Sequence, residues 1–263
     1  MYSSAHLNYL KSIKRRQVLI KISQIVIFLI FVAVWELLTY FKIFNAFLTS
    51  CPSMIMNTAI NLYKGNNLFP HVFITIYETI ISFSLATIIG IGIATILWWN
   101  DFLAKIFDPY LTILNSLPKV ALGPIIIIWA GANAKSIILM ALLISTIITI
   151  ITMYNGFNYF DENKIKLLKS FKAKKIDIFL KAVLPGNLST IINTLKINVS
   201  MSLIGVIMGE LLVSRKGIGY LIMYGSQVFN LNLVVTGIIL LAIVSYIMYW
   251  LVCYLEKVII KDT

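Results

Sequence analysis

Residues 161–185 read DENKIKLLKSFKAKKIDIFLKAVLP, a strongly basic segment between long apolar runs. It holds seven of the 22 Lys and Arg residues of the chain. A lysine at the centre of a bilayer costs several kcal/mol, so this segment must lie in water. Short loops rich in Lys and Arg remain on the cytoplasmic side. A helical spacing of apolar residues indicates that the segment docks onto another protein. Those residues are Ile165, Leu168, Phe171, Ile176, Phe179, Leu180 and Val183.

The composition is that of a membrane protein. The chain is 60% apolar and 12% charged, with a mean hydropathy of +0.92, whereas soluble domains hold about 45–50% apolar and about 25% charged residues. Its 263 residues leave no room for a sizeable soluble domain beside the spans. The net charge of +12 comes from Lys and Arg residues that flank the apolar runs. They form no continuous basic face of the kind that binds nucleic acid. We therefore predict contact with membrane lipid and none with nucleic acid.

Six apolar runs predict an all-α integral membrane protein with six transmembrane helices. We expect a basic cytoplasmic N-terminus at residues 1–17 and one membrane domain at residues 18–260. The third run contains Pro109, Pro118 and Pro124, and prolines leave backbone groups that neighbouring helices or water must satisfy. This run is therefore expected to be a broken span beside a solvated pathway. The runs lie at 18–41, 71–98, 102–130, 137–154, 188–213 and 231–255.

The distribution of Lys and Arg predicts the orientation of these spans. With the basic segment inside, fifteen of the 22 Lys and Arg residues fall in inside segments and five in outside segments. The remaining two, Lys119 and Lys196, fall within spans. Because an excess of Lys and Arg marks cytoplasmic loops, we predict a multi-pass protein whose N- and C-termini are both cytoplasmic.

Polar and small residues in the fifth run suggest a role in a solute path or in helix packing. Gly205 and Gly209 form a Gly-x-x-x-Gly pair, which favours close contact between helices. Glu210 should face protein or water rather than lipid. It either lines the path or pairs with Arg215 or Lys216. The residues assigned to the path or to packing are Asn198, Ser202, Gly205, Gly209 and Glu210.

A second carboxyl group, that of Glu78, lies inside the second run. A carboxylate at this depth needs a partner. By elimination, the sequence leaves Lys119 and Lys196 as the candidates.

No catalytic or cofactor-binding motif is present in the sequence. It lacks the phosphate-cradling Gly-x-x-x-x-Gly-Lys-Ser/Thr and a Ser-centred nucleophile elbow. Its His, Cys and acidic residues lack metal-ligand spacing. We therefore predict that the chain is not an enzyme, holds no metal or cofactor and does not hydrolyse ATP itself.

Part of a known loop signature ends the basic segment. Leu184 and Pro185 match it, whereas Ala182 stands where Ile is usual, Lys172 where Gly is usual, and residues 166–168 where Glu-Ala-Ala is usual. The full signature is Glu-Ala-Ala, three residues, Gly, nine residues and Ile-x-Leu-Pro. The basic segment thus resembles, with a degraded motif, the cytoplasmic loop of permeases in ATP-binding-cassette (ABC) importers.

Further segments, in the same order, resemble the nitrate/sulfonate/taurine group of these permeases. LPKVALGP is similar to the group's Leu-Pro-x-x-Ala-x-x-Pro, and GIGYLI to its Gly-Leu-Gly-Tyr-Leu-Ile. One departure is Glu78, because the group often has Arg at this position. The matching residues are 35–38 in the first span, 47–48 and 52–53 after it, 117–124 and 129–131 at the third, Glu210 in the fifth and 217–222 after it.

The resemblance implies a MetI-like importer-permease architecture in the plasma membrane of a prokaryote. It also implies three kinds of protein partner. A second permease subunit, expected to form a homodimer with the first, would complete the path, and a cytoplasmic ATPase dimer would hold ATP and Mg. An external binding protein would deliver a small solute, such as a sulfonate, taurine, nitrate or a vitamin precursor.

The resemblance makes the basic segment an ATPase-coupling loop, with apolar anchors in a groove and lysines that steer toward acidic surface. Its spacing alone fits an anchor on anionic lipid equally well. Two other functions stay open, a secondary transporter or channel that needs no ATPase, and a non-transporting anchor subunit. The residues assigned to the coupling contact are Lys166, Leu168, Phe171, Lys172, Ala182, Leu184 and Pro185.

Overall fold

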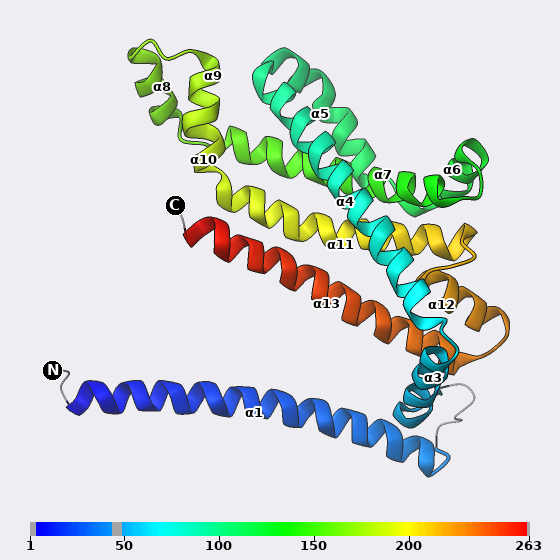
Figure 1. The fold of residues 1–263 in the computed structure, drawn as a ribbon. Helices are drawn as coiled ribbons and strands as arrows, with labels where there is room; N and C mark the ends of the chain where they lie inside the picture. Colours follow the sequence, from blue (N-terminus) through cyan, green and yellow to red (C-terminus); the bar gives the residue numbers. More distant parts are fainter. Residues whose placement is uncertain (1–3, 44–48, 262–263) are drawn as a thin grey trace.

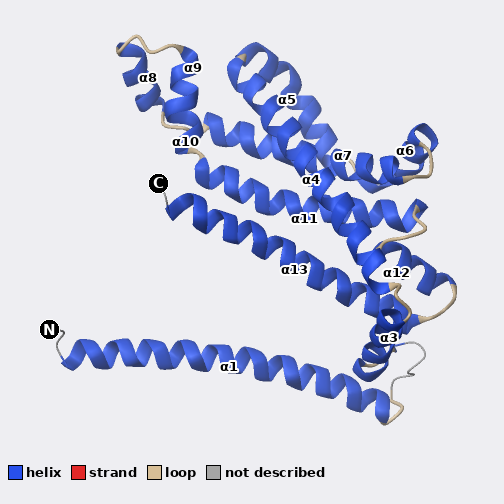
Figure 2. Ribbon diagram, in the orientation of Figure 1, coloured by secondary structure: helices blue, strands red, loops and turns tan. Residues whose placement is uncertain are grey.

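The computed structural model describes residues 4–43 and 49–261 (Figure 1). Residues 47–48, which belong to the resemblance described above, lie outside that part. Figure 2 shows helices joined by loops and turns, with no strand among the described residues. The long helices are α1 (Ser4–Tyr40), α4 (Leu68–Trp99), α7 (Ala134–Asn158), α11 (Leu188–Val213) and α13 (Leu231–Lys261).

These five helices are long and apolar enough to cross a membrane, and a bent pair of helices passes the same test when its two parts are taken together as one broken segment. The pair consists of α5 (Asp101–Ser116) and the segment η1 (Lys119–Leu122) with α6 (Gly123–Ala130), at an angle of 88°. Leu117 is extended before Pro118, because a residue that precedes proline is pushed out of the helical region. The predicted all-α fold is confirmed, and the predicted break lies at Pro118, whereas Pro109 lies inside α5.

The centre of the domain is formed by α4, α7 and α11 (Figure 1). Glycines allow these helices to touch. A Cβ added at Gly205 would lie 2.4 Å from Ala141 Cα, and one at Gly209 would lie 2.8 Å from Ile137 Cα, both in α7. In the same way, Gly90 of α4 lies against Thr149 of α7. Small residues at such contacts let backbones approach closely, which strengthens packing where lipid offers no hydrophobic driving force.

Two shorter helices, α12 and α3, lie at the end of the bundle that contains the C-terminus of α11. Helix α12 (Ile218–Gln227) packs on α13, α11 and α4, and α3 (Pro52–Lys64) packs on α13. The hydroxyl of Ser50 donates to the Asn232 side chain at 2.7 Å, which joins the chain before α3 to the start of α13.

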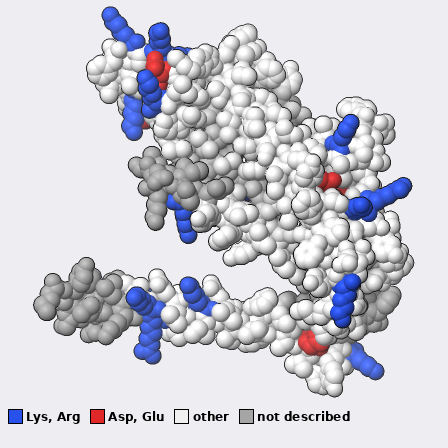
Figure 3. All heavy atoms as spheres, in the orientation of Figure 1, with Lys and Arg blue, Asp and Glu red and all other residues white. Residues whose placement is uncertain are grey.

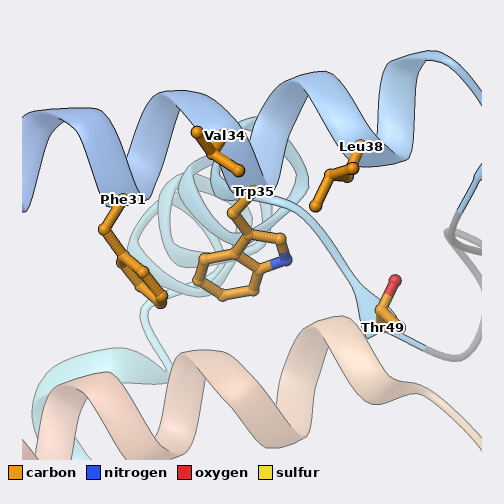
Figure 4. A pocket seen from close by; sticks show the side chains of 5 residues that line it. All are labelled: Phe31, Val34, Trp35, Leu38 and Thr49. Carbon is orange, nitrogen blue, oxygen red and sulfur yellow. The ribbon is translucent and has the colours of Figure 1, made fainter.

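Helix α1 stands apart from this bundle (Figure 1). None of its most apolar stretch is buried within the subunit, and its main packing contact is with α3. The Glu36 carboxylate accepts hydrogen bonds from the backbone N–H and hydroxyl of Ser53, at 3.1 and 2.8 Å. A groove of about 330 Å³ lies along its inner face (Figure 4), lined by Phe31, Val34, Trp35, Leu38 and Thr49.

Lys and Arg side chains gather toward the two ends of the molecule, and a broad uncharged surface separates them (Figure 3). The basic segment, the start of α1 and the end of α13 share one end, whereas α3, α6 and α12 share the other (Figure 1). This arrangement is what a membrane-spanning domain requires, because charged groups avoid the hydrocarbon.

We expect Gly205→Ala to destabilise the chain. Its added Cβ would enter the backbone of α7, and overpacking of this kind costs about 1–3 kcal/mol. Thermal unfolding of the purified chain in detergent would show a lower Tm. Gly92→Ala is the matched control, because Gly92 lies in the exposed part of α4 with open space around it. It should leave the Tm unchanged or raise it. Equal Tm values for the two variants would contradict the close α11–α7 contact.

Candidate functional site: the basic hairpin and the buried acidic pair

The basic segment folds into a hairpin at the end of the bundle. It comprises α8 (Glu162–Ser170), α9 (Lys175–Ile178), the π-helical turn η2 (Phe179–Val183) and α10 (Leu184–Gly186). The Asp161 side chain caps α8 by accepting from the Asn163 N–H at 2.9 Å. The turn between α8 and α9 holds Lys172 at φ 58. Only glycine, and to a lesser degree Asn or Asp, adopts this left-handed conformation readily. The family signature has glycine at this position.

The inner face of the hairpin is fixed to the membrane helices. Phe179 is buried, with its ring centroid 5.0 Å from Trp98 of α4 and 5.3 Å from Phe157 of α7. Ile178 and Val183 belong to the same buried cluster. In addition, the Lys175 ammonium donates to the Trp99 carbonyl at 2.7 Å. The hairpin is therefore packed into the domain and does not hang from it as a free loop.

Its outer face carries the exposed part of the apolar stripe. Phe171 is 74% exposed and Leu167 is 57% exposed, while Ile176 and Leu180 are also exposed. The apolar residues that were predicted as one docking stripe therefore divide between the two faces. Leu167 was missed by the sequence reasoning, although its i, i+4 spacing to Phe171 was a usable signal.

The seven residues assigned to coupling do not all lie on the outer face. Lys166 is exposed and forms an ion pair with Glu162 at 3.2 Å. Phe171, Lys172 and Pro185 are also exposed. The others are half-buried, and these are Leu168, Ala182 and Leu184.

Glu210 is fully buried and is held by Thr75 of α4 and by the first turn of α12. Its Oε1 accepts from the Thr75 hydroxyl at 2.6 Å, and its Oε2 accepts from the Gly219 N–H at 2.6 Å. The Ile218 N–H donates to the same Thr75 oxygen at 2.9 Å. At Gly217, φ is +106 and an added Cβ would lie 2.3 Å from the Glu210 carboxyl. A close approach of backbone to side chain explains the need for glycine there.

The partners expected for Glu78 were wrong, and so was the ion pair that was one of two alternatives for Glu210. Glu210 forms no ion pair with the basic residues that follow it within the described chain. Glu78 lies instead within hydrogen-bonding reach of Glu210 itself. Lys196 pairs with Glu256 at 2.7 Å, and Lys119 donates to the Asn115 carbonyl at 2.9 Å. Sequence reasoning missed this outcome because it sought opposite charges.

The other residues assigned to the fifth span lie inside the subunit. The Asn198 amide donates to the Thr87 hydroxyl of α4 at 2.7 Å, and Ser202 is fully buried. Gly205 and Gly209 face α7, as described above. By contrast, α5 exposes polar residues that the prediction did not include, among them Asp108, Asn115 and Ser116. No group of three or more His, Cys, Asp or Glu that could hold a metal occurs in the described residues.

Residues 86–261 match the family model described as the binding-protein-dependent transport system inner membrane component. The chain belongs to this family. It is a multi-pass permease subunit of the cell membrane, which serves an ATP-driven importer of a small solute. The predicted resemblance to permeases of ABC importers is confirmed.

Several known proteins are similar to the chain over most of its length. It is 27% identical over 232 residues to the putative aliphatic sulfonates transport permease SsuC of Bacillus subtilis, which covers 88% of this chain and 84% of that protein. It is 19% identical over 238 residues to the taurine permease TauC of Escherichia coli, with 89% and 86% covered. The formylaminopyrimidine permease ThiX of Halalkalibacterium halodurans is 25% identical over 193 residues, with 73% and 76% covered.

Among solved structures, an inward-facing form of the MetNI methionine ABC transporter has the same fold. Its chain aligns with a TM-score of 0.65 and 19% identity, and the match covers 73% of this chain and 95% of that chain. The MetI-like architecture is thereby confirmed.

We expect Lys172→Gly to stabilise the hairpin. The left-handed conformation costs an L-residue roughly 1–2 kcal/mol, which glycine avoids, although greater freedom of the unfolded chain offsets part of the gain. The Tm of the purified chain should rise by a few degrees. Lys174→Gly is the control, because Lys174 is extended at φ -70 and gains nothing from glycine. A Tm that fell equally in both variants would rule out strain at Lys172.

Proposed function

We propose that the outer face of the basic hairpin binds a cytoplasmic ATPase dimer, and that ATP and Mg are held by this dimer and not by the permease chain. The exposed Phe171 carries the proposal, because it stands on a hairpin whose other face is packed against Trp98 and Phe157. A large exposed aromatic side chain among lysines is suited to a groove with acidic surroundings. Force applied to such a hairpin would pass into α4 and α7 rather than being lost in a flexible loop.

An anchor on anionic lipid is the competing function for this segment. A helix that lies on a membrane presents a continuous apolar face along its length. Here, Phe179 and Val183 of the apolar stripe are turned into the protein core, and a turn at Lys172 interrupts the helix. The exposed apolar surface is therefore short, which favours a compact protein groove over a lipid surface.

We also propose that the solute path lies against α5 and not along α11. The polar face of α5 is not covered by other helices of the subunit. This helix nevertheless forms one part of the bent pair that we interpret as a broken membrane span. Polar groups at membrane depth favour protein or water over lipid. A second copy of the chain, forming a homodimer, would enclose such a face.

An external binding protein would deliver the solute, and the named relatives favour a sulfonate, taurine or a vitamin precursor.

The binding contact can be tested with Phe171→Asp. A buried charge in place of an aromatic anchor should reduce the ATPase that co-purifies with the permease by at least about tenfold, because a hot-spot side chain contributes about 2 kcal/mol or more. Phe229→Asp is the matched control, since Phe229 is 71% exposed on the loop before α13. It should retain the ATPase.

Phe171→Asp should keep the Tm of the native chain because its ring is exposed. Phe229→Asp should keep that Tm or raise it, because Phe229 lies at φ 54, which Asp adopts more readily than Phe. If the ATPase co-purified fully with Phe171→Asp at an unchanged Tm, Phe171 would not contact the ATPase. The hairpin would then serve as a lipid anchor or in an anchor subunit. Leu168 is a poorer choice for this experiment because it is half-buried against the core of the domain.

We further propose that the hairpin and both termini are cytoplasmic. Lys169→Cys on the hairpin should resist a membrane-impermeant thiol reagent in whole cells, whereas Lys216→Cys at the opposite end should react. The native thiols provide a low background, since Cys51 is buried and Cys253 is half-buried. If only Lys169→Cys were labelled, the orientation would be the reverse of the one proposed. The hairpin would then lie outside the cell and could not contact a cytoplasmic ATPase.

A further inference from the structure

Two buried carboxyl groups meet at the junction of α4, α11 and α12. Glu210 of α11 is 0% exposed and Glu78 of α4 is 4% exposed. The two side chains lie within hydrogen-bonding reach of each other. The buried Oε2 of Glu78 has no hydrogen-bond partner, and the same side chain lines a cavity of about 590 Å³. This oxygen therefore lacks the donor that a buried ionised carboxylate needs.

The charged and titratable neighbours do not neutralise this pair. Arg215 and Lys216 line the cavity but are exposed, and the structure shows neither in an ion pair with a glutamate. His71 of α4 accepts the Gly217 N–H at its Nδ1, and its ring stacks on Tyr220 of α12. Tyr77 lies on the cavity wall. Two ionised glutamates in contact would therefore lack a counter-ion, which is costly in a site removed from water.

The hydrogen bonds assign different roles to the two carboxyl groups. An ionised carboxylate can only accept, so a hydrogen bond between two carboxyl groups needs a proton on one of them. Glu210 receives a donor on each oxygen, from Thr75 and from Gly219. Such donors stabilise the ionised form. Glu78 has no donor on its buried oxygen, which suits the protonated form.

We propose that Glu78 and Glu210 form a proton-binding site, in which Glu78 holds the proton and donates it to the Glu210 carboxylate. Like-charged carboxyl groups in contact commonly share one proton, because both cannot be ionised at once. The proton joins α4 to α11, and Glu210 in turn holds the start of α12 through Gly219. The cavity gives the proton a route from the end of the bundle that carries Asn133, Ser214 and Lys216.

Loss of the proton would place two negative charges in contact between α4 and α11. The junction would then be weakened where Gly217 and Gly219 approach Glu210 most closely. An unfolded chain has already released both glutamate protons at neutral pH. The native chain holds one more proton than the unfolded chain, so its stability falls as pH rises. This sign is opposite to that of an ion pair between a glutamate and a lysine, which gains stability as the carboxyl group ionises.

The proton can be observed directly by infrared spectroscopy of the purified full-length chain in detergent. The native chain should show the C=O stretch of a buried protonated carboxylic acid near neutral pH, and that band should disappear at alkaline pH. Glu78→Gln, which replaces the acid by a neutral group of the same shape, should lack the band. Glu256→Gln is the matched control, because Glu256 is paired with Lys196. This control should retain the band.

Thermal unfolding gives a second, independent readout. The Tm of the native chain and of Glu256→Gln should fall as pH is raised from about 6 to about 9, whereas Glu78→Gln should show a flatter profile. Glu78→Arg replaces the proton with a fixed positive charge and should likewise lose the dependence.

Absence of the band from the native chain at every pH would overturn the proposal. So would a band that persists in Glu78→Gln, since one glutamate would then hold the proton alone. A Tm that follows sodium concentration at constant pH would identify a metal cation in place of the proton. Neither measurement uses an ATPase or a solute, so these outcomes are independent of the function proposed above.

Discussion

The contact of α11 with α7 is the interaction on which the membrane domain depends. Lipid chains are as apolar as leucine side chains, so burial alone gives membrane helices little reason to associate. Close packing must therefore supply the attraction. Gly205 and Gly209 have no side chains, so the backbone of α11 lies directly against α7 at these two positions. Helix α4 joins the same centre, with Gly90 against Thr149. This three-helix centre positions both the hairpin and the acidic pair.

The hairpin and the acidic pair show two ways in which polar chemistry is attached to an apolar scaffold. The hairpin lies beyond the ends of the spans, where water can solvate its lysines, and one aromatic cluster around Phe179 fixes it in place. The acidic pair lies between helices, where the Thr75 hydroxyl and the Gly219 N–H at the start of α12 replace water around Glu210. This buried carboxyl group is tolerated because each of its two oxygens receives a hydrogen bond from a nearby donor.

Much of the fold could be predicted from the sequence because its signals are local. The six apolar runs correspond to five spanning helices and one bent pair, and Pro118 marks the bend. The division of the hairpin into inner and outer faces was not predictable, since it depends on Trp98 and Phe157 from helices distant in the chain. The partner of Glu78 was missed for another reason. Sequence rules pair a buried acid with a base, and they do not include a second acid that shares its proton.

The position of α11 links the two sites. It follows α10 after a single residue, Asn187, and Glu210 lies near its far end. With 26 residues, α11 is about 39 Å long at a rise of 1.5 Å per residue. Toward its other end, the ion pair between Lys196 and Glu256 ties α11 to α13. Because one continuous helix joins the hairpin to the acidic pair, a tilt of α11 as a rigid rod would move the lysine-rich hairpin and change the separation of the two carboxyl groups together.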